Sequence, residues 1–163
     1  MNRQKQQSRT EFVRIAADER DRERGLRERF VAYWETASGE PRAIYDAFIS
    51  ACPLADEVVV EAVDVGSVRG WWVRPQHAKA GRAILFLHGG GYVQGSAKAY
   101  RGFASQIVSR AQMPALVIDY PLAPEATVPA APQAALAAAG WLVAKASAEW
   151  RLSAIRRAAV WRS

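Results

Sequence analysis

The sequence is poor in the residues that build disulfides, metal sites and membrane spans. Its 163 residues include one cysteine and two histidines, which excludes an internal disulfide and favours a reducing compartment. No apolar run approaches the length that a transmembrane helix needs. Residues 1–8 are polar, unlike a secretory signal peptide. These absences predict a cytoplasmic protein with no membrane span, and we expect neither a metal nor another cofactor.

Basic residues are in modest excess, since 22 basic and 16 acidic residues give a net charge of +6. An arginine-rich N-terminal helix suits nucleic acid or an anionic membrane surface. One hypothesis is therefore a non-catalytic interaction module that binds through this helix. The charges alternate in sign over residues 18–24, however, which is more typical of a solvated helix face. The leading interpretation includes no nucleic-acid partner.

Two amphipathic helices are predicted ahead of residue 53. The first runs from Ser8 to about Thr36, because Ser8 and Glu11 have the spacing of a capping box and apolar residues recur at helical intervals. The second covers residues 43–52. Gly39 and Pro41 separate the two. We expect residues 1–53 to form a helical cap region.

Beyond Pro53 the apolar period changes to that of strands. Residues 57–63 and 68–73 predict an antiparallel hairpin. Residues 83–87 and 115–120 are apolar runs typical of buried strands, and helices are expected over 97–111, capped by Ser96, and over 130–145. Strand, helix, strand, helix in this order predicts an α/β fold with a right-handed parallel crossover.

Three consecutive glycines after the strand at 83–87 carry the predicted chemistry. His88, Gly89, Gly90, Gly91 and Tyr92 follow that strand directly, and ligands of open α/β sheets bind at the carboxyl ends of strands. Glycines at such a place permit backbone angles that a β carbon forbids and aim bare N–H groups at a developing negative charge. We expect His88 to anchor this loop by hydrogen bonding.

Three motifs occur in a characteristic order: H-G-G-G-Y at 88–92, D-Y-P-L-A-P-E at 119–125 and V-P-A-A at 128–131. In this order the chain resembles the hormone-sensitive-lipase-like family of carboxylesterases. The resemblance covers about residues 57–145. It implies the N-terminal portion of an α/β-hydrolase fold, with a helical cap and an antiparallel hairpin leading into a mostly parallel sheet. It also implies an oxyanion hole at Gly89, Gly90 and Gly91, supported by His88 and Tyr92, and short-chain acyl esters as substrates. Pro121, and Pro132 with Gln133, depart from the family pattern.

The nucleophile of that family is missing. No G-x-S-x-G elbow occurs, and neither do its following acid and histidine. His77 lies upstream and is interpreted as a surface residue, and Ser96 and Ser105 as a cap and a helix residue without an activating base. No residue of the catalytic triad is therefore expected in this chain, and the chain is predicted to be an inactive, truncated form of a serine esterase.

The last thirteen residues suggest why the nucleophile motif is missing. When a GC-rich set of codons for residues 151–163 is read from its third base, it encodes Ala-Val-Gly-Asp-Ser-Ala-Gly-Gly, the missing elbow. We therefore interpret residues 54–150 as the N-terminal half of the hydrolase domain and residues 151–163 as a frameshifted tail. Without the elbow strand, residues 84–87 become an unpaired apolar sheet edge, which predicts self-association.

Overall fold

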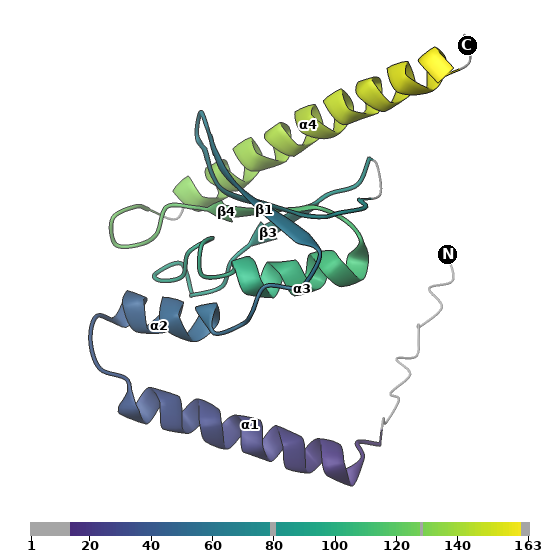
Figure 1. Ribbon diagram of the computed structural model, residues 1–163. Helices are drawn as coiled ribbons and strands as arrows, with labels where there is room; N and C mark the ends of the chain where they lie inside the picture. The colour runs from purple at the N-terminus through teal and green to yellow at the C-terminus, as the bar shows by residue number, and fades with distance from the viewer. Residues whose placement is uncertain (1–13, 79–80, 128, 161–163) are drawn as a thin grey trace, which may run out of the picture. The chain divides into compact units, whose positions relative to one another are not determined.

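The computed structural model describes residues 14–78, 81–127 and 129–160. The chain divides into two compact units, residues 1–38 and residues 39–163. Helix α1 (Ala17–Thr36) lies in the first unit. In the second, the order of elements is α2 (Pro41–Ser50), β1 (Val58–Val65), β2 (Val68–Pro75), β3 (Ile84–Leu87), α3 (Arg101–Ala111), β4 (Ala115–Asp119) and α4 (Ala130–Val160) (Figure 1).

Helix α1 begins later than the sequence pattern predicts. Arg14 to Ala16 are not helical, and the predicted capping box of Ser8 and Glu11 lies outside the described residues. The helix starts where acidic residues become available, since the Glu19 carboxylate accepts a hydrogen bond from the Ala16 backbone N–H at 3.2 Å. Negative charge in a first turn is favoured by the helix dipole.

The four described strands form one sheet in the order β1-β2-β4-β3. The predicted hairpin is confirmed: β1 and β2 pair antiparallel, and two residues connect Val65 to Val68. The predicted crossover is also confirmed, because β3 and β4 pair in parallel with α3 between them in the chain. Strand β2 pairs antiparallel with β4. Strand β3 therefore lies at the edge of the described sheet.

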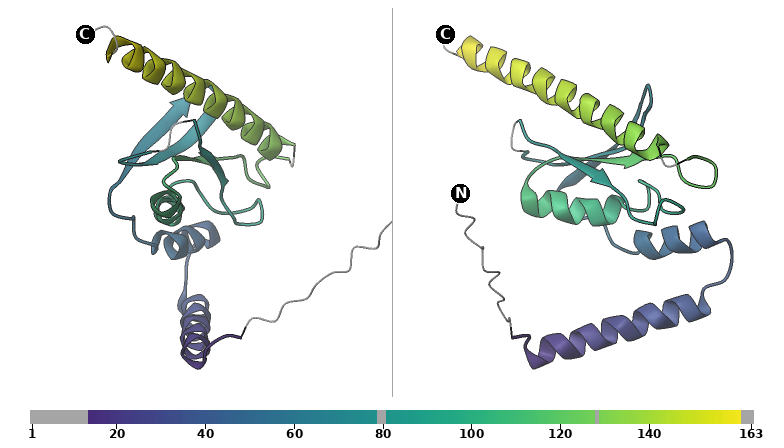
Figure 2. Two further views of the ribbon diagram at one scale, coloured as in Figure 1. Left: turned by 90° about the vertical axis from the view of Figure 1, so that its right-hand side faces the viewer. Right: turned by 180° about the vertical axis from the view of Figure 1, so that it is seen from behind.

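Helices cover both faces of this sheet, α4 on one and α3 on the other (Figures 1 and 2). Successive side chains of a strand point to opposite faces, so neighbouring residues of β4 enter different cores. Leu116 and Ile118 pack with Ala138 of α4, whereas Val117 packs with Val108 of α3. Burying each such large apolar side chain stabilises the fold by about 1.5–3 kcal/mol.

Both long helices differ from their predicted bounds. Helix α3 begins at Arg101 rather than residue 97, because residues 97–100 form turns. Helix α4 continues to Val160, well beyond residue 145. Residues 146–160 contain neither glycine nor proline and are rich in alanine and arginine, which favours continuation of the helix. No helix among the described residues has the length and apolar character of a membrane span.

Candidate active site

The glycine loop leaves the carboxyl end of β3 beside the end of β4. Because these strands pair in parallel with Leu87 opposite Ile118, residues 88–92 and residues 119–125 emerge at the same edge of the sheet. The two segments are hydrogen bonded, since the Ala123 N–H donates to the Tyr92 carbonyl at 2.8 Å. The fold thus joins two motifs that are about thirty residues apart in sequence.

His88 lies buried at the base of the loop. Its side chain is only 4% exposed and stacks on the Tyr120 ring at 4.2 Å between centroids. Its Nδ1 lies 2.9 Å from the Gly89 carbonyl oxygen, so Nδ1 carries the proton, because a carbonyl can only accept. The Tyr120 hydroxyl donates to the His88 carbonyl at 2.6 Å, and burial raises the pKa of Tyr120.

Gly90 and Gly91 adopt backbone angles that other residues rarely reach, with φ of 123° and 63°. The Gly90 carbonyl accepts hydrogen bonds from the N–H groups of Val93 and Gln94, each at 3.1 Å, which closes a tight turn. Within the described part of the chain, the N–H groups of Gly90 and Gly91 donate to no protein acceptor. Two adjacent N–H groups without acceptors form an arrangement that can bind an oxygen anion.

A cavity of about 450 Å³ lies beside this turn. Four of the five predicted site residues border it, whereas Gly90 does not. Tyr92 is 57% exposed at its rim. The remaining walls are mostly apolar, which suits the alkyl part of a small ligand. The lining residues are Leu87, His88, Gly89, Gly91, Tyr92, Tyr120, Ala131, Pro132 and Ala135.

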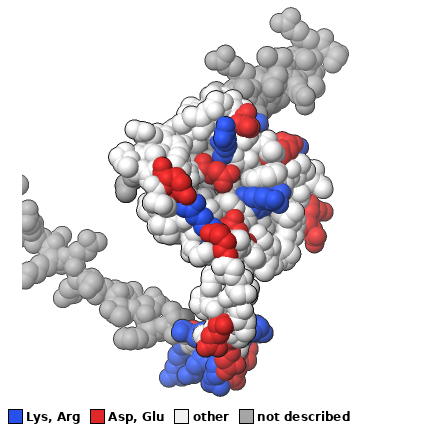
Figure 3. All heavy atoms as spheres, turned by 90° about the vertical axis from the view of Figure 1, so that its left-hand side faces the viewer, with Lys and Arg blue, Asp and Glu red and all other residues white. Residues whose placement is uncertain are grey.

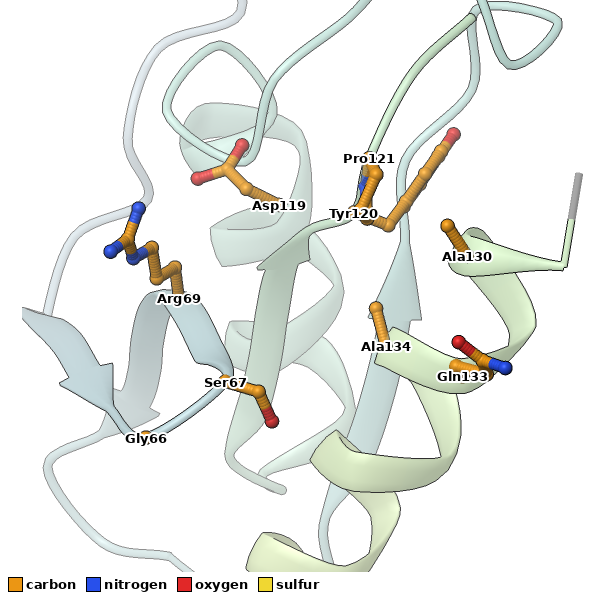
Figure 4. Close-up of a pocket in the computed structure, with 9 residues that line it drawn as sticks. All are labelled: Gly66, Ser67, Arg69, Asp119, Tyr120, Pro121, Ala130, Gln133 and Ala134. Carbon is orange, nitrogen blue, oxygen red and sulfur yellow. The ribbon is translucent and has the colours of Figure 1, made fainter. Parts of the chain in front are cut away.

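A second hollow, of about 690 Å³, shares Tyr120 with the first and lies between the β1–β2 turn and the start of α4 (Figure 4). Its charged groups already have partners. Asp119 accepts a hydrogen bond from the Ala97 N–H at 2.7 Å, and Arg69 lies 3.4 Å from Asp64. The Asp119 carboxylate therefore holds the backbone at Ala97, whereas the Arg69–Asp64 pair is largely exposed to solvent.

Ser105 and the upstream His77 have the structural roles that the sequence predicts, whereas the prediction that Ser96 caps the helix is wrong. Tyr100 occupies the N-cap position of α3, and the Ser96 hydroxyl instead accepts from the Ala99 N–H at 3.1 Å in the turns at 97–100. Ser105 is fully buried in α3, where its hydroxyl donates to the Gly102 carbonyl at 2.6 Å. His77 is exposed after β2. Among the described residues there is no group of three or more His, Cys, Asp or Glu side chains that could hold a metal.

Helix α2 makes contacts with this site that the sequence pattern does not predict. Arg42 donates to the Val93 carbonyl at 2.7 Å and pairs with the Glu125 carboxylate at 2.8 and 2.9 Å. This pairing holds the pKa of Glu125 below its ordinary value and raises that of Arg42. The sequence offers no signal that specifies this pairing, because a carboxylate as exposed as that of Glu125, at 63%, is solvated without a cationic partner.

The chain is similar to known esterases. Residues 84–160 match a family model described as alpha/beta hydrolase fold. The chain is 36% identical over 116 residues to an acetyl-hydrolase of Streptomyces hygroscopicus, an alignment that covers 69% of this chain and 38% of that protein. It is 42% identical over 71 residues to an ethyl acetate hydrolase of Pseudomonas putida, covering 44% of this chain and 22% of that one.

Solved structures agree with the sequence comparison. An esterase from the bacterial hormone-sensitive lipase family superposes with a TM-score of 0.65 and 33% sequence identity, covering 81% of this chain and 44% of that one. The chain therefore spans less than half of the length of each of these relatives. The predicted family resemblance and the predicted α/β-hydrolase fold are both confirmed.

Proposed function

Because this chain belongs to the hormone-sensitive-lipase-like family of the α/β-hydrolase fold, we propose that it carries the oxyanion-binding half of a carboxylic ester hydrolase site. The observation that carries the proposal is the glycine turn, whose adjacent Gly90 and Gly91 N–H groups have no acceptor among the described residues. In the reaction, a serine attacks the ester carbonyl and the carbonyl oxygen becomes an anion. These N–H groups bind that anion, and one such donor contributes about 2.7–4 kcal/mol in known cases.

The proposed substrates are small esters with short acyl chains. The cavity of about 450 Å³ borders Gly91 and has mostly apolar walls, which suits an alkyl group next to a reacting carbonyl. The names of an acetyl-hydrolase and an ethyl acetate hydrolase among the relatives support the same class. Gly89 borders the cavity as well and shapes the turn, while His88 and Tyr92 support it.

We propose that the 163-residue chain does not hydrolyse esters by itself. Its sequence contains no G-x-S-x-G motif, and among the described residues neither Ser96 nor Ser105 hydrogen bonds to a histidine. We ascribe this to a shifted reading frame that begins shortly before Arg151. The DNA sequence of the locus tests this cause directly: a frame that cannot encode Gly-Asp-Ser-Ala-Gly opposite residues 151–163 removes it.

Hydrolysis of p-nitrophenyl acetate and butyrate tests the function. We expect no release of p-nitrophenol above background from the 163-residue chain, and release that a serine-directed phosphonate abolishes from a frame-restored protein. If the 163-residue chain is active and the phosphonate blocks that activity, the proposal that this chain is inactive is contradicted. An inactive but folded frame-restored protein would contradict the esterase proposal itself.

The hypothesis of an interaction module rests on α1 and has weak support. Two of its arginines pair with acids of the same helix, Arg27 with Glu23 at 2.6 Å and Arg24 with Asp21 at 3.4 Å. Figure 3 shows basic and acidic side chains next to each other on this helix. Binding to DNA or to anionic liposomes that falls steeply with salt would support it, and no binding at low salt would remove it.

Two further proposals concern partners and location. Strand β3 is the edge of the described sheet and its Leu87 is 50% exposed, so we propose self-association through the unpaired backbone groups of this strand. A cytoplasmic location is proposed from the single cysteine alone, and fractionation of the producing cells tests it.

A further inference from the structure

Helix α2 presents three polar side chains on one face to the glycine loop. Arg42, Tyr45 and Asp46 are spaced i, i+3 and i+4, which places them together on a helix surface. The helix is fixed at its start, where the Glu40 carboxylate accepts a hydrogen bond from the Ala43 N–H at 2.8 Å. We call these three residues the α2 clamp. They contact the beginning, the middle and the end of the loop that runs from residue 88 to residue 96.

Arg42 makes the contact at the middle. Its Nε donates to the Val93 carbonyl and one Nη donates to the Ala123 carbonyl, both at 2.7 Å. Glu125 binds the guanidinium through both carboxylate oxygens. The Gln94 N–H, which belongs to the same peptide unit as the Val93 carbonyl, donates to the Gly90 carbonyl at 3.1 Å. Only this one peptide unit separates the guanidinium from the turn that sets the direction of the Gly90 and Gly91 N–H groups.

Tyr45 makes the contact at the beginning of the loop. Its hydroxyl lies 2.8 Å from the hydroxyl of Tyr100. A β carbon placed on Gly89 would lie 2.8 Å from the Tyr100 hydroxyl oxygen and 3.4 Å from that of Tyr45. The two hydroxyl groups therefore pack directly against the Gly89 backbone, and burial followed by the bond to Tyr45 raises the pKa of Tyr100.

Asp46 makes the contact at the end of the loop. Its Oδ2 accepts a hydrogen bond from the Ser96 hydroxyl at 2.6 Å. Ser96 also accepts from the Ala99 N–H, so Asp46 fixes the residue from which the chain turns toward α3. With Arg42 and Tyr45, the clamp holds the loop on both sides of Gly90 and Gly91.

We propose that Arg42, Tyr45 and Asp46 are positioning residues that set the backbone geometry of the Gly90 and Gly91 N–H groups. The inference rests on the proposed role of those groups as oxyanion donors. It gives α2 a task at the site itself, in addition to packing. A guanidinium with four hydrogen-bond contacts fits this task, because its planar fork holds several oxygens in fixed directions.

Amide hydrogen exchange of the 163-residue chain tests the clamp. In Arg42→Gln, we expect exchange of the Val93 and Gln94 amides to rise roughly tenfold, as expected when about 1.4 kcal/mol of loop stability is lost. The amides of Leu116 and Val117 in β4 should change much less. In Arg42→Lys, exchange of the Val93 and Gln94 amides should lie between that of the wild type and that of Arg42→Gln, since an ammonium reaches fewer acceptors. Arg110→Gln is the matched control, because Arg110 is exposed and, within the part of the chain that the structure describes, it hydrogen bonds to Gln106 of its own helix and not to the glycine loop.

Butyrate titration followed by amide chemical shifts gives the second measurement. The anion of this product acid should move the Gly90 and Gly91 resonances saturably in the wild-type chain. Misplaced donors should weaken this binding by roughly ten- to hundredfold in Arg42→Gln. Tyr45→Phe and Asp46→Asn should act in the same direction, and Arg110→Gln should bind as the wild type does.

The outcomes separate the two proposals. If butyrate leaves both glycine resonances unmoved in the wild type, the proposed oxyanion role fails, while the exchange measurement still tests the clamp. If exchange of the Val93 and Gln94 amides in Arg42→Gln equals that of the control, the clamp fails. If Arg42→Gln accelerates exchange of the Val93 and Gln94 amides only as much as exchange of the β4 amides, the role of Arg42 is purely structural. That result would also overturn the inference.

Discussion

Replacing Gly90 with alanine should damage the glycine turn far more than the same change at Gly91. A β carbon on Gly90 would lie 1.9 Å from the Gln94 carbonyl oxygen and 2.6 Å from its carbonyl carbon. These are backbone atoms, so they cannot move aside as the end of a flexible side chain can. On Gly91 the added carbon would meet nothing within 4 Å.

The expected magnitudes follow from this geometry. Gly90→Ala must break the turn, which loses two hydrogen bonds to the Gly90 carbonyl, each about 1 kcal/mol. Forcing alanine toward φ of 123° adds about 1–3 kcal/mol of strain, so we expect a total of about 3–5 kcal/mol. Gly91→Ala has only the left-handed conformation to accommodate, at about 1 kcal/mol.

Urea unfolding followed by tryptophan fluorescence measures the difference. Trp72 and Trp141 pack edge to face at 5.6 Å in the core and report on the sheet and α4 together. With a slope of about 1.5 kcal/mol per molar urea, the midpoint should fall by roughly 2–3 M in Gly90→Ala and by less than about 0.7 M in Gly91→Ala. Equal shifts, or a larger shift for Gly91→Ala, would refute the turn geometry.

Three other changes test the surroundings of the loop. Tyr120→Phe leaves the His88 carbonyl without its donor and should lower the free energy of unfolding by about 1–2 kcal/mol, measured by the same urea titration; an unchanged midpoint contradicts the anchor. The pKa of Glu125 is held below 4.5 by Arg42, so its stabilisation is complete above that pH and is lost as the pH falls through the lowered pKa. Glu125→Gln should therefore flatten the decline in melting temperature between about pH 5 and pH 3, and parallel curves for both proteins would argue against the pairing. Leu87→Lys places a charge on the sheet edge and should reduce concentration-dependent association in size-exclusion chromatography; an unaltered profile excludes β3 as the contact.

Local patterns predict the sheet well and the contacts of the site poorly. The hairpin and strands β3 and β4 lie within two residues of their predicted bounds, because alternation and apolar runs are properties of neighbouring residues. His88 and the glycines were predicted as a unit for the same reason. The start of α3 was wrong because the turns at 97–100 depend on Asp119, which binds the Ala97 N–H.

The contacts of α2 could not be predicted from the sequence pattern. Arg42 and Glu125 are 83 residues apart, and Asp46 and Ser96 are 50 apart. An amphipathic pattern shows that α2 packs on something, but it does not show that the polar edge of the helix binds loop carbonyls. Such pairs become visible only once the sheet brings residues 88–96 and 119–125 together.

The same separation sets an order of events during synthesis on the ribosome. Glu125 and the Ala123 carbonyl leave the ribosome long after Arg42 has emerged, so α2 has no complete docking site until β4 and the segment after it are made. Closing a loop of this length has an entropic cost that only later contacts offset. The glycine turn therefore reaches its final shape only after residues 119–125 have been made, although its own residues are adjacent in sequence.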